Sequence, residues 1–265
     1  MLDQNKSDTT DIAEVMEFTQ MESARQGFVS ALRKHVMVDL AGEMRQDYET
    51  NVKPTYTKNN GEEPGTPRDV KKAMKPRTRY RMWSSLRYNA QEMVWASVQN
   101  GVERALPEMI HLAKDAAETN PAGGSLRLDP DLKIPRYVSA LDVHLMPGCF
   151  HTEHTKDDVA QGAVQVIGGE VFRGSFRHRK GNPGAVGDSI AHYLKLKHPD
   201  FDPKRILDLG CNTGKNLFPY LDVYPDAEAH GVDVGAPLLR YGHAVASHDG
   251  LPVHFSQQNA EHLNF

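Results

Sequence analysis

A glycine-containing loop is the first place where this sequence could bind a ligand. Residues 206–209 are typical of a short buried strand, and they run directly into the loop Gly210 to Gly214, which has the sequence GCNTG and precedes a helix-like segment. Glycines let the backbone turn sharply and approach a ligand, and amide groups at a helix start offer hydrogen-bond donors. The sequence therefore predicts a ligand site at the carboxyl end of this strand.

Two later strand ends carry suitable partners for a nucleoside. Asp233 ends the second expected strand, 23 positions after Gly210, where a carboxylate can accept hydrogen bonds from both hydroxyls of a ribose. Asn259 follows the third expected strand and could contact an adenine amino group, while Ala260 leaves room for the ring. Together the three strand ends predict a site for an adenosyl group.

The same loop disfavours two other nucleotide ligands. A dinucleotide fingerprint requires glycine at positions 212 and 215, where this chain has Asn212 and Lys215. A phosphate-binding loop requires serine or threonine after the lysine, and here Asn216 follows it.

Residues 207–214 resemble motif I of the class I S-adenosylmethionine-dependent methyltransferases, and residues 232–234 and 258–261 resemble the next two motifs. The resemblance covers about residues 188–265. It implies S-adenosylmethionine as cofactor, with the loop against its methionine part, Asp208 orienting the ammonium group and Asp233 holding the ribose. The cofactor-binding residues that it implies are Asp208, Gly210, Cys211, Asn212, Gly214, Asp233, Val234, Asn259 and Ala260.

Two positions depart from the family pattern. Asn212 replaces the usual middle glycine of the loop, and asparagine can substitute because it tolerates left-handed backbone angles. Asn259 stands where an aspartate is common, so the adenine contact is the weakest of the three expectations.

The order of elements around these motifs predicts an α/β fold. Strand-like segments at 205–209, 229–234 and from 253 alternate with helix-like segments at 215–223 and from 237, which is the β-α-β-α-β order of a parallel sheet with crossover helices. We expect a mainly α-helical N-terminal region followed by an incomplete Rossmann-like sheet.

Hydrophobic periodicity and turn residues divide the chain into four parts. We expect an N-terminal helical segment (1–50), a linker or loop rich in proline and glycine (51–80), a mainly helical region that could cap the substrate (81–183) and the S-adenosylmethionine-binding domain (184–265). Within the third part, Pro107 suits the first turn of a new helix.

The resemblance also implies that the domain is truncated, because the family fold has seven strands and only three are expected here. We therefore expect a fragment that is inactive alone, with an exposed apolar edge on the strand 206–209. Family members commonly supply catalytic groups after the fourth strand, so we assign no catalytic residue. The expected acceptor is a small molecule, and His144, His151 and His154 are candidate bases from the cap, although isolated histidines are usually structural.

Three alternatives stay open. Cys149, His151 and His154, with Glu153 or Asp142, could bind zinc, but the spacing is not that of paired cysteine motifs, and we predict no metal. A non-enzymatic adenosyl-binding module is the second alternative, although the intact motifs argue against a degenerate domain. An RNA substrate could be held by the basic segment 68–81, whose cationic residues are Arg68, Lys71, Lys72, Lys75, Arg77, Arg79 and Arg81, with Tyr80, Trp83 and Tyr88 close by.

Composition excludes several classes. The net charge of −4 and the pI near 6.3 give no overall attraction to nucleic acid or anionic membranes. Two cysteines are too few for a disulfide framework, and no signal peptide or membrane-spanning run is present in the sequence. We expect a soluble cytoplasmic protein with reduced thiols.

Overall fold

The C-terminal part forms a parallel sheet. The computed structural model describes residues 10–142, 144–174 and 186–264. Its sheet has the order β1-β4-β3-β2 and all three pairings are parallel. The strands are β1 (Ser125–Arg127), β2 (Arg205–Leu209), β3 (Glu228–Asp233) and β4 (Val253–Gln257). The expected fold class is confirmed, and β1 is an addition that the pattern did not reveal because only three residues form it.

Two helices of this part pack on the sheet. A buried cluster joins Leu217 and Leu221 at α9 (Phe218–Val223) and Leu239 of α10 (Ala236–His248) with Phe255 of β4. A further helix, α8 (Val186–Lys197), contacts α9. Residues 215–223 were expected to be helical, but the helix begins only at Phe218, because the turn that follows Gly214 occupies residues 215–217.

The outer edge of β2 is open in the part of the chain that the structure describes, because β3 is its one neighbour in the sheet. Leu207 and Leu209 of this strand are 45% and 50% exposed. The expected apolar edge is therefore present.

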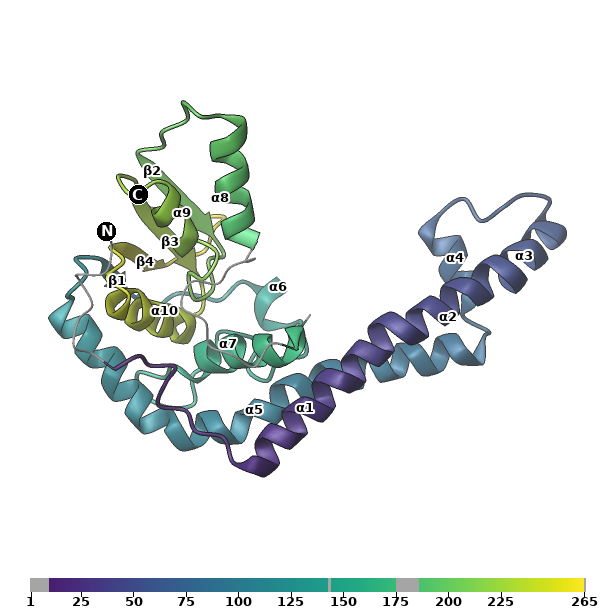
Figure 1. Ribbon diagram of the computed structural model, residues 1–265, viewed down its shortest axis with the longest axis horizontal. Coiled ribbons are helices and arrows are strands. Elements are labelled where there is room, and N and C mark those ends of the chain that lie inside the picture. The colour runs from purple at the N-terminus through teal and green to yellow at the C-terminus, as the bar shows by residue number, and fades with distance from the viewer. Residues whose placement is uncertain (1–9, 143, 175–185, 265) are drawn as a thin grey trace.

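The N-terminal region is a long helical hairpin. Thr19 caps α1 (Gln20–Lys34) in a capping box with Glu22, and α5 (Thr78–Thr119) runs back beside it, so that the two extend away from the sheet as an arm (Figure 1). The first limb continues beyond α1 through two π-helical segments, in the order η1 (His35–Asp39), α2 (Leu40–Asp47), η2 (Tyr48–Val52) and α3 (Lys53–Asn60).

The segment 51–80, expected to be a linker or loop, is helical over most of its length. It contains α3, α4 (Pro67–Met74) and the start of α5, with a turn from Gly61 to Thr66 between the first two. Pro67 stands in the first turn of α4, where the missing amide costs nothing, and Pro54 lies where η2 passes into α3. Pro64 and Pro76 lie in the turns between helices, and Gly61 ends α3 in a left-handed conformation. The residues that suggested a linker thus lie at helix ends and in short turns.

Pro107 does not begin a new helix but lies inside α5. Proline removes one backbone hydrogen bond and bends a helix, and α5 curves along its course around the rest of the molecule (Figure 1).

One buried cluster joins the helical region to the sheet domain. Val94 and Val98 of α5 and Ile167 of α7 (Ala160–Arg173) share this cluster with Tyr241 of α10. Alpha-helix α10 therefore contributes side chains to two cores, one on the sheet and one among the helices. The remaining helix, α6 (Arg136–Ser139), is a single turn.

Candidate functional site

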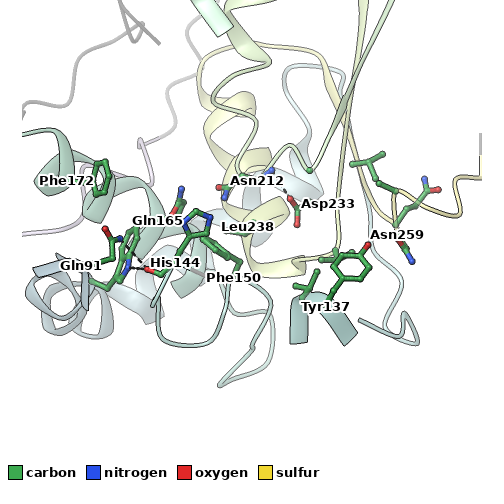
Figure 2. A pocket seen from close by; sticks show the side chains of 18 of the residues that line it. Gln91, Tyr137, His144, Phe150, Gln165, Phe172, Asn212, Asp233, Leu238 and Asn259 are labelled. Atoms are coloured by element: carbon green, nitrogen blue, oxygen red, sulfur yellow. Dashed lines mark hydrogen bonds between the residues drawn. The ribbon is translucent and has the colours of Figure 1, made fainter. Parts of the chain in front are cut away.

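A pocket of about 540 Å³ lies at the carboxyl ends of β2, β3 and β4 (Figure 2). Its volume is within the usual range for small-molecule sites. Six of the predicted cofactor residues line it, namely Gly210, Asn212, Asp233, Val234, Asn259 and Ala260. The structure therefore brings the three predicted strand ends to one cavity, and it leaves Asp208, Cys211 and Gly214 outside the lining.

The loop after β2 owes its shape to three left-handed residues. Gly210, Asn212 and Gly214 have φ angles of 73°, 56° and 79°. A side chain at Gly214 would come within 2.7 Å of the Phe218 ring, whereas one at Gly210 would meet no protein atom within 4 Å. The expectation that Asn212 adopts a left-handed conformation in place of glycine is confirmed.

Asp233 fixes the loop against the end of β3. One carboxylate oxygen accepts a hydrogen bond from the amide of Asn212 and the other from the amide of Gly235, both at 2.9 Å. Burial raises the pKa of Asp233, although these backbone donors act in the opposite direction. Each oxygen accepts one of these bonds and retains lone-pair capacity toward the pocket that Asp233 lines.

Asp208 and Cys211 lie behind the lining. Burial raises the pKa of Asp208, and the charge of Asp233 raises it further. Cys211 is buried in the cluster on the sheet, and burial raises the pKa of its thiol. The thiol is thus a packing group and is poorly suited to act as a nucleophile.

The opposite half of the pocket comes from the helical region, and we call it the helical half. The carbonyl of His144 holds the loop before α7 to α5, because it accepts hydrogen bonds from Trp95 Nε1 at 2.9 Å and from Gln91 Nε2 at 3.3 Å. The sequence pattern placed a cap here but identified only His144 among its lining residues. The lining residues of the helical half are Gln91, Trp95, Tyr137, Val138, His144, Phe150, Gln165, Gly169, Phe172 and Arg173.

The proposed zinc ligands do not converge. The thiol of Cys149 donates to the carbonyls of Val138 and Leu141, and the amide of His154 donates to Asp158. No cluster of three metal-binding side chains occurs within residues 10–142, 144–174 and 186–264. Of the three candidate histidines, His144 alone lines the pocket.

The basic segment lies at the far end of the arm and uses part of its charge internally. Arg77 forms a bidentate ion pair with Asp47, and Arg79 pairs with Glu43. Tyr80 and Trp83 pack against a small buried cluster of Met44, Val52 and Met74. The aromatic side chains near the basic residues are therefore largely committed to packing.

A profile of the family described as "Methyltransferase domain" matches residues 206–265, which include the loop, β3 and β4. The C-terminal segment is thus similar to a methyltransferase domain. Its match begins at β2 and includes all six predicted residues that line the pocket.

Two curated relatives share part of the chain. "Methyltransferase ungE'" of Aspergillus campestris (strain IBT 28561) is 30% identical over 77 residues, which are 28% of this chain and 22% of the relative. "Uncharacterized protein RP028" of Rickettsia prowazekii (strain Madrid E) is 32% identical over 54 residues, 20% of this chain and 22% of the relative. The matches thus span about a fifth of each relative's length.

No solved structure matches the chain at the same stringency. Among the described residues, no helix combines the length and the apolar character that crossing a membrane requires.

Proposed function

We propose that this protein binds S-adenosylmethionine and transfers its methyl group to a small molecule. One observation carries the proposal: the left-handed loop Gly210 to Gly214 and the carboxylate of Asp233 meet at one pocket at the ends of adjacent parallel strands. Ligands of open parallel sheets bind at this edge. Asp233 would accept hydrogen bonds from the ribose, and Asn259 with Ala260 would adjoin the adenine.

For methyl transfer, the protein mainly has to position the two reactants. A nucleophilic atom of the acceptor forms a bond to the methyl carbon while the carbon–sulfur bond breaks, and its electron pair stays on sulfur as S-adenosylhomocysteine leaves. The enzyme's main contribution is to hold the two reactants in line. Where the acceptor must lose a proton, His144 is the candidate to receive it, since its imidazole lies in the lining of the helical half.

A small acceptor suits the pocket better than RNA does. The helical half lines the pocket opposite the strand ends with side chains from α5, α6 and α7. The basic segment at the arm's end pairs two of its arginines with carboxylates, and Tyr80 and Trp83 pack inward. A cavity that is lined from two sides therefore supports a ligand that fits between them.

Calorimetric titration with S-adenosylhomocysteine tests the proposal. We expect wild-type protein to bind, and Asp233→Ala to weaken binding by tenfold or more, because a charge-assisted hydrogen bond contributes about 1.5–3 kcal/mol. Asp222→Ala, which removes an exposed carboxylate of α9, is the matched control and should bind as the wild type does.

Heat from NADH or ATP with none from S-adenosylhomocysteine would show that the cofactor assignment is wrong. Equal affinities of the Asp233→Ala and Asp222→Ala variants for S-adenosylhomocysteine would instead show that Asp233 does not contribute to binding.

A further inference from the structure

We propose that the far end of the helical arm binds the phosphate backbone of a nucleic-acid duplex. The surface is the basic face of α4, which we define as Arg68, Lys71, Lys72 and Lys75. This end of the arm points away from the sheet and its pocket (Figure 1). A duplex held there is therefore a docking partner of the protein, and the inference is independent of the small methyl acceptor proposed above.

The basic face forms a single stripe along the helix. Its four residues have i, i+3, i+4 and i+7 spacing, which places them on one side of an α-helix, and all four are exposed. At the usual rise of an α-helix the stripe is about 10 Å long. Roughly three phosphates of one strand follow one another over that length of duplex axis. The stripe therefore matches a row of phosphates in length and in charge.

The opposite side of α4 fixes the orientation of this stripe. Val70, Ala73 and Met74 belong to the small cluster that also contains Met44 and Val52. Helices that lie on a membrane bury their apolar side in the lipid, whereas the apolar side of α4 is already covered by protein. The cations face solvent without an apolar side that could enter a bilayer, and this favours a nucleic acid over a membrane surface.

The charges of the basic face have no carboxylate partner among the described residues. Asp69, the acidic residue of α4, accepts hydrogen bonds from the amide and hydroxyl of Thr66 in the helix cap. The chain as a whole carries a net charge of −4, so attraction to phosphates depends on this local stripe. Three other cations at this end of the arm are neutralised in ion pairs, namely Lys53 with Glu63, Arg77 with Asp47 and Arg79 with Glu43.

Arg81 adds a fixed cation at one end of the stripe. Its Nε donates to the carbonyl of Lys75 at 3.1 Å and its Nη2 to the carbonyl of Pro76 at 2.9 Å. Both partners are uncharged, so the exposed guanidinium keeps its full positive charge. Because the side chain is already held in place, little conformational entropy remains to be lost when a phosphate binds.

The nearest aromatic residues after α4 in the sequence do not offer stacking surfaces for bases. Tyr80 and Trp83 pack against the small cluster under α4, and Trp83 Nε1 donates to the carbonyl of Val36. Proteins that hold single strands combine cations with aromatic rings on which bases stack. A cationic face without such rings contacts the backbone and reads no sequence, and a duplex presents its phosphates more densely than a single strand does.

Fluorescence polarisation tests the proposal on the full chain. The probes are fluorescein-labelled duplexes of about 20 base pairs, one of RNA and one of DNA, which both present continuous rows of phosphates. Contact with roughly three phosphates gives a slope of about −2.7 for the logarithm of affinity against that of salt concentration. We therefore expect the affinity for at least one duplex to fall roughly 40-fold between about 50 and 200 mM salt.

A triple substitution identifies the surface. Lys71→Gln/Lys72→Gln/Lys75→Gln should weaken binding by tenfold or more and should make the salt dependence shallower by about one unit of slope for each lysine that contacts a phosphate. Lys71→Arg/Lys72→Arg/Lys75→Arg keeps the charges and should bind as the wild type does. The arginine variant therefore gives a decisive measurement even if the glutamine variant fails to fold.

The matched control removes the same charge elsewhere. Lys133→Gln/Lys156→Gln/Lys197→Gln changes three exposed lysines outside the arm and should retain the affinity for the duplex. Equal losses in the two glutamine variants, or a loss in the arginine variant, would overturn the proposal. Absence of binding to both duplexes at low salt would do the same.

Two other ligands complete the test. Tighter binding to a single strand of the same sequence than to either duplex would contradict recognition by the duplex backbone. Stronger binding to vesicles of phosphatidylcholine and phosphatidylserine than to both duplexes would assign the basic face to a membrane instead and overturn the proposal. Duplex binding without binding of S-adenosylhomocysteine would refute the proposed function alone, because the basic face is remote from the pocket.

Discussion

Individual residues of the loop could be predicted because their constraints are local. Asn212 was expected in a left-handed conformation from its type and its place between glycines, and its φ of 56° confirms this. Asp233 was placed by its distance along the chain from a strand-to-helix turn, and parallel strands bring such positions together. Gln165 and Trp95 could not be recognised, since nothing near them in the sequence differs from ordinary helix positions.

The conformation of Asn212 leads to a test with a matched pair. Asn212→Gly should keep the fold, because glycine adopts positive φ without strain. Asn212→Val should lower the free energy of unfolding by about 1–2 kcal/mol, the cost of a left-handed angle for a residue with a β-carbon, and should weaken binding of S-adenosylhomocysteine. Urea unfolding and calorimetry measure both effects. A loss in Asn212→Gly as large as in Asn212→Val would contradict the role of backbone angle.

At the scale of elements, helix boundaries were harder to predict than helix existence. The proline and glycine content of 51–80 suggested a linker, yet Gly61 ends α3 and Pro67 begins α4. Helix α7 lies within 81–183, which was expected to be mainly helical, but its bounds were not predicted, and its Gly168 allows close contact with the Trp95 ring. A glycine kept for packing cannot be distinguished from a turn glycine without the neighbouring helix.

The start of α1 is held to α5 by an ion pair that should respond to acid. Arg104 donates to both oxygens of Glu22, at 3.1 and 2.9 Å, and to the carbonyl of Glu17. The hydrogen bond with Arg104 and the amide of Thr19 lower the pKa of Glu22 to about 2. In the unfolded chain Glu22 takes up its proton near its ordinary pKa of 4.5, whereas the folded form resists until about pH 2.

The unfolded state therefore binds more protons between these pH values, and stability rises with pH across that interval. We expect the contribution of Glu22 to be complete above pH 4.5 and to be lost as the pH falls toward 2. Thermal midpoints of the wild type and Glu22→Gln should differ at pH 6 and converge toward pH 2. A constant difference across this range would show that the ion pair is not responsible.

For the whole molecule, the alternation of strands and helices was sufficient to predict the α/β class, but not the way its two parts join. The cap was expected as a separate region, and α10 instead packs against the sheet on one side and against α5 and α7 on the other. This arrangement depends on contacts such as that of Gly162 with Tyr241, 79 positions apart. The hydrophobic periodicity of either segment does not indicate which residue of the other segment it contacts.

Gly162 offers a direct test of this shared core. A side chain there would come within 2.4 Å of Tyr241 Cβ and 3.1 Å of the carbonyl of Pro237, whereas one at Gly169 on the same helix would lie 3.5 Å from the nearest atom, the end of the flexible Arg173 side chain. Gly162→Ala should therefore destabilise the protein by about 1–3 kcal/mol through overpacking. Gly169→Ala should be neutral or stabilising by up to about 1 kcal/mol through helix propensity.

Thermal unfolding followed by Trp fluorescence compares the two parts. The wild-type tryptophans Trp83 and Trp95 both lie in α5 and report the helical region, whereas Tyr224→Trp in a background of Trp83→Phe and Trp95→Phe reports the sheet domain. If α10 couples the cores, both signals should shift together to lower temperature in Gly162→Ala, because the substitution loosens one side of a helix on which the other core also depends. A shift in the helical signal alone would mean that the cap and the methyltransferase domain unfold independently.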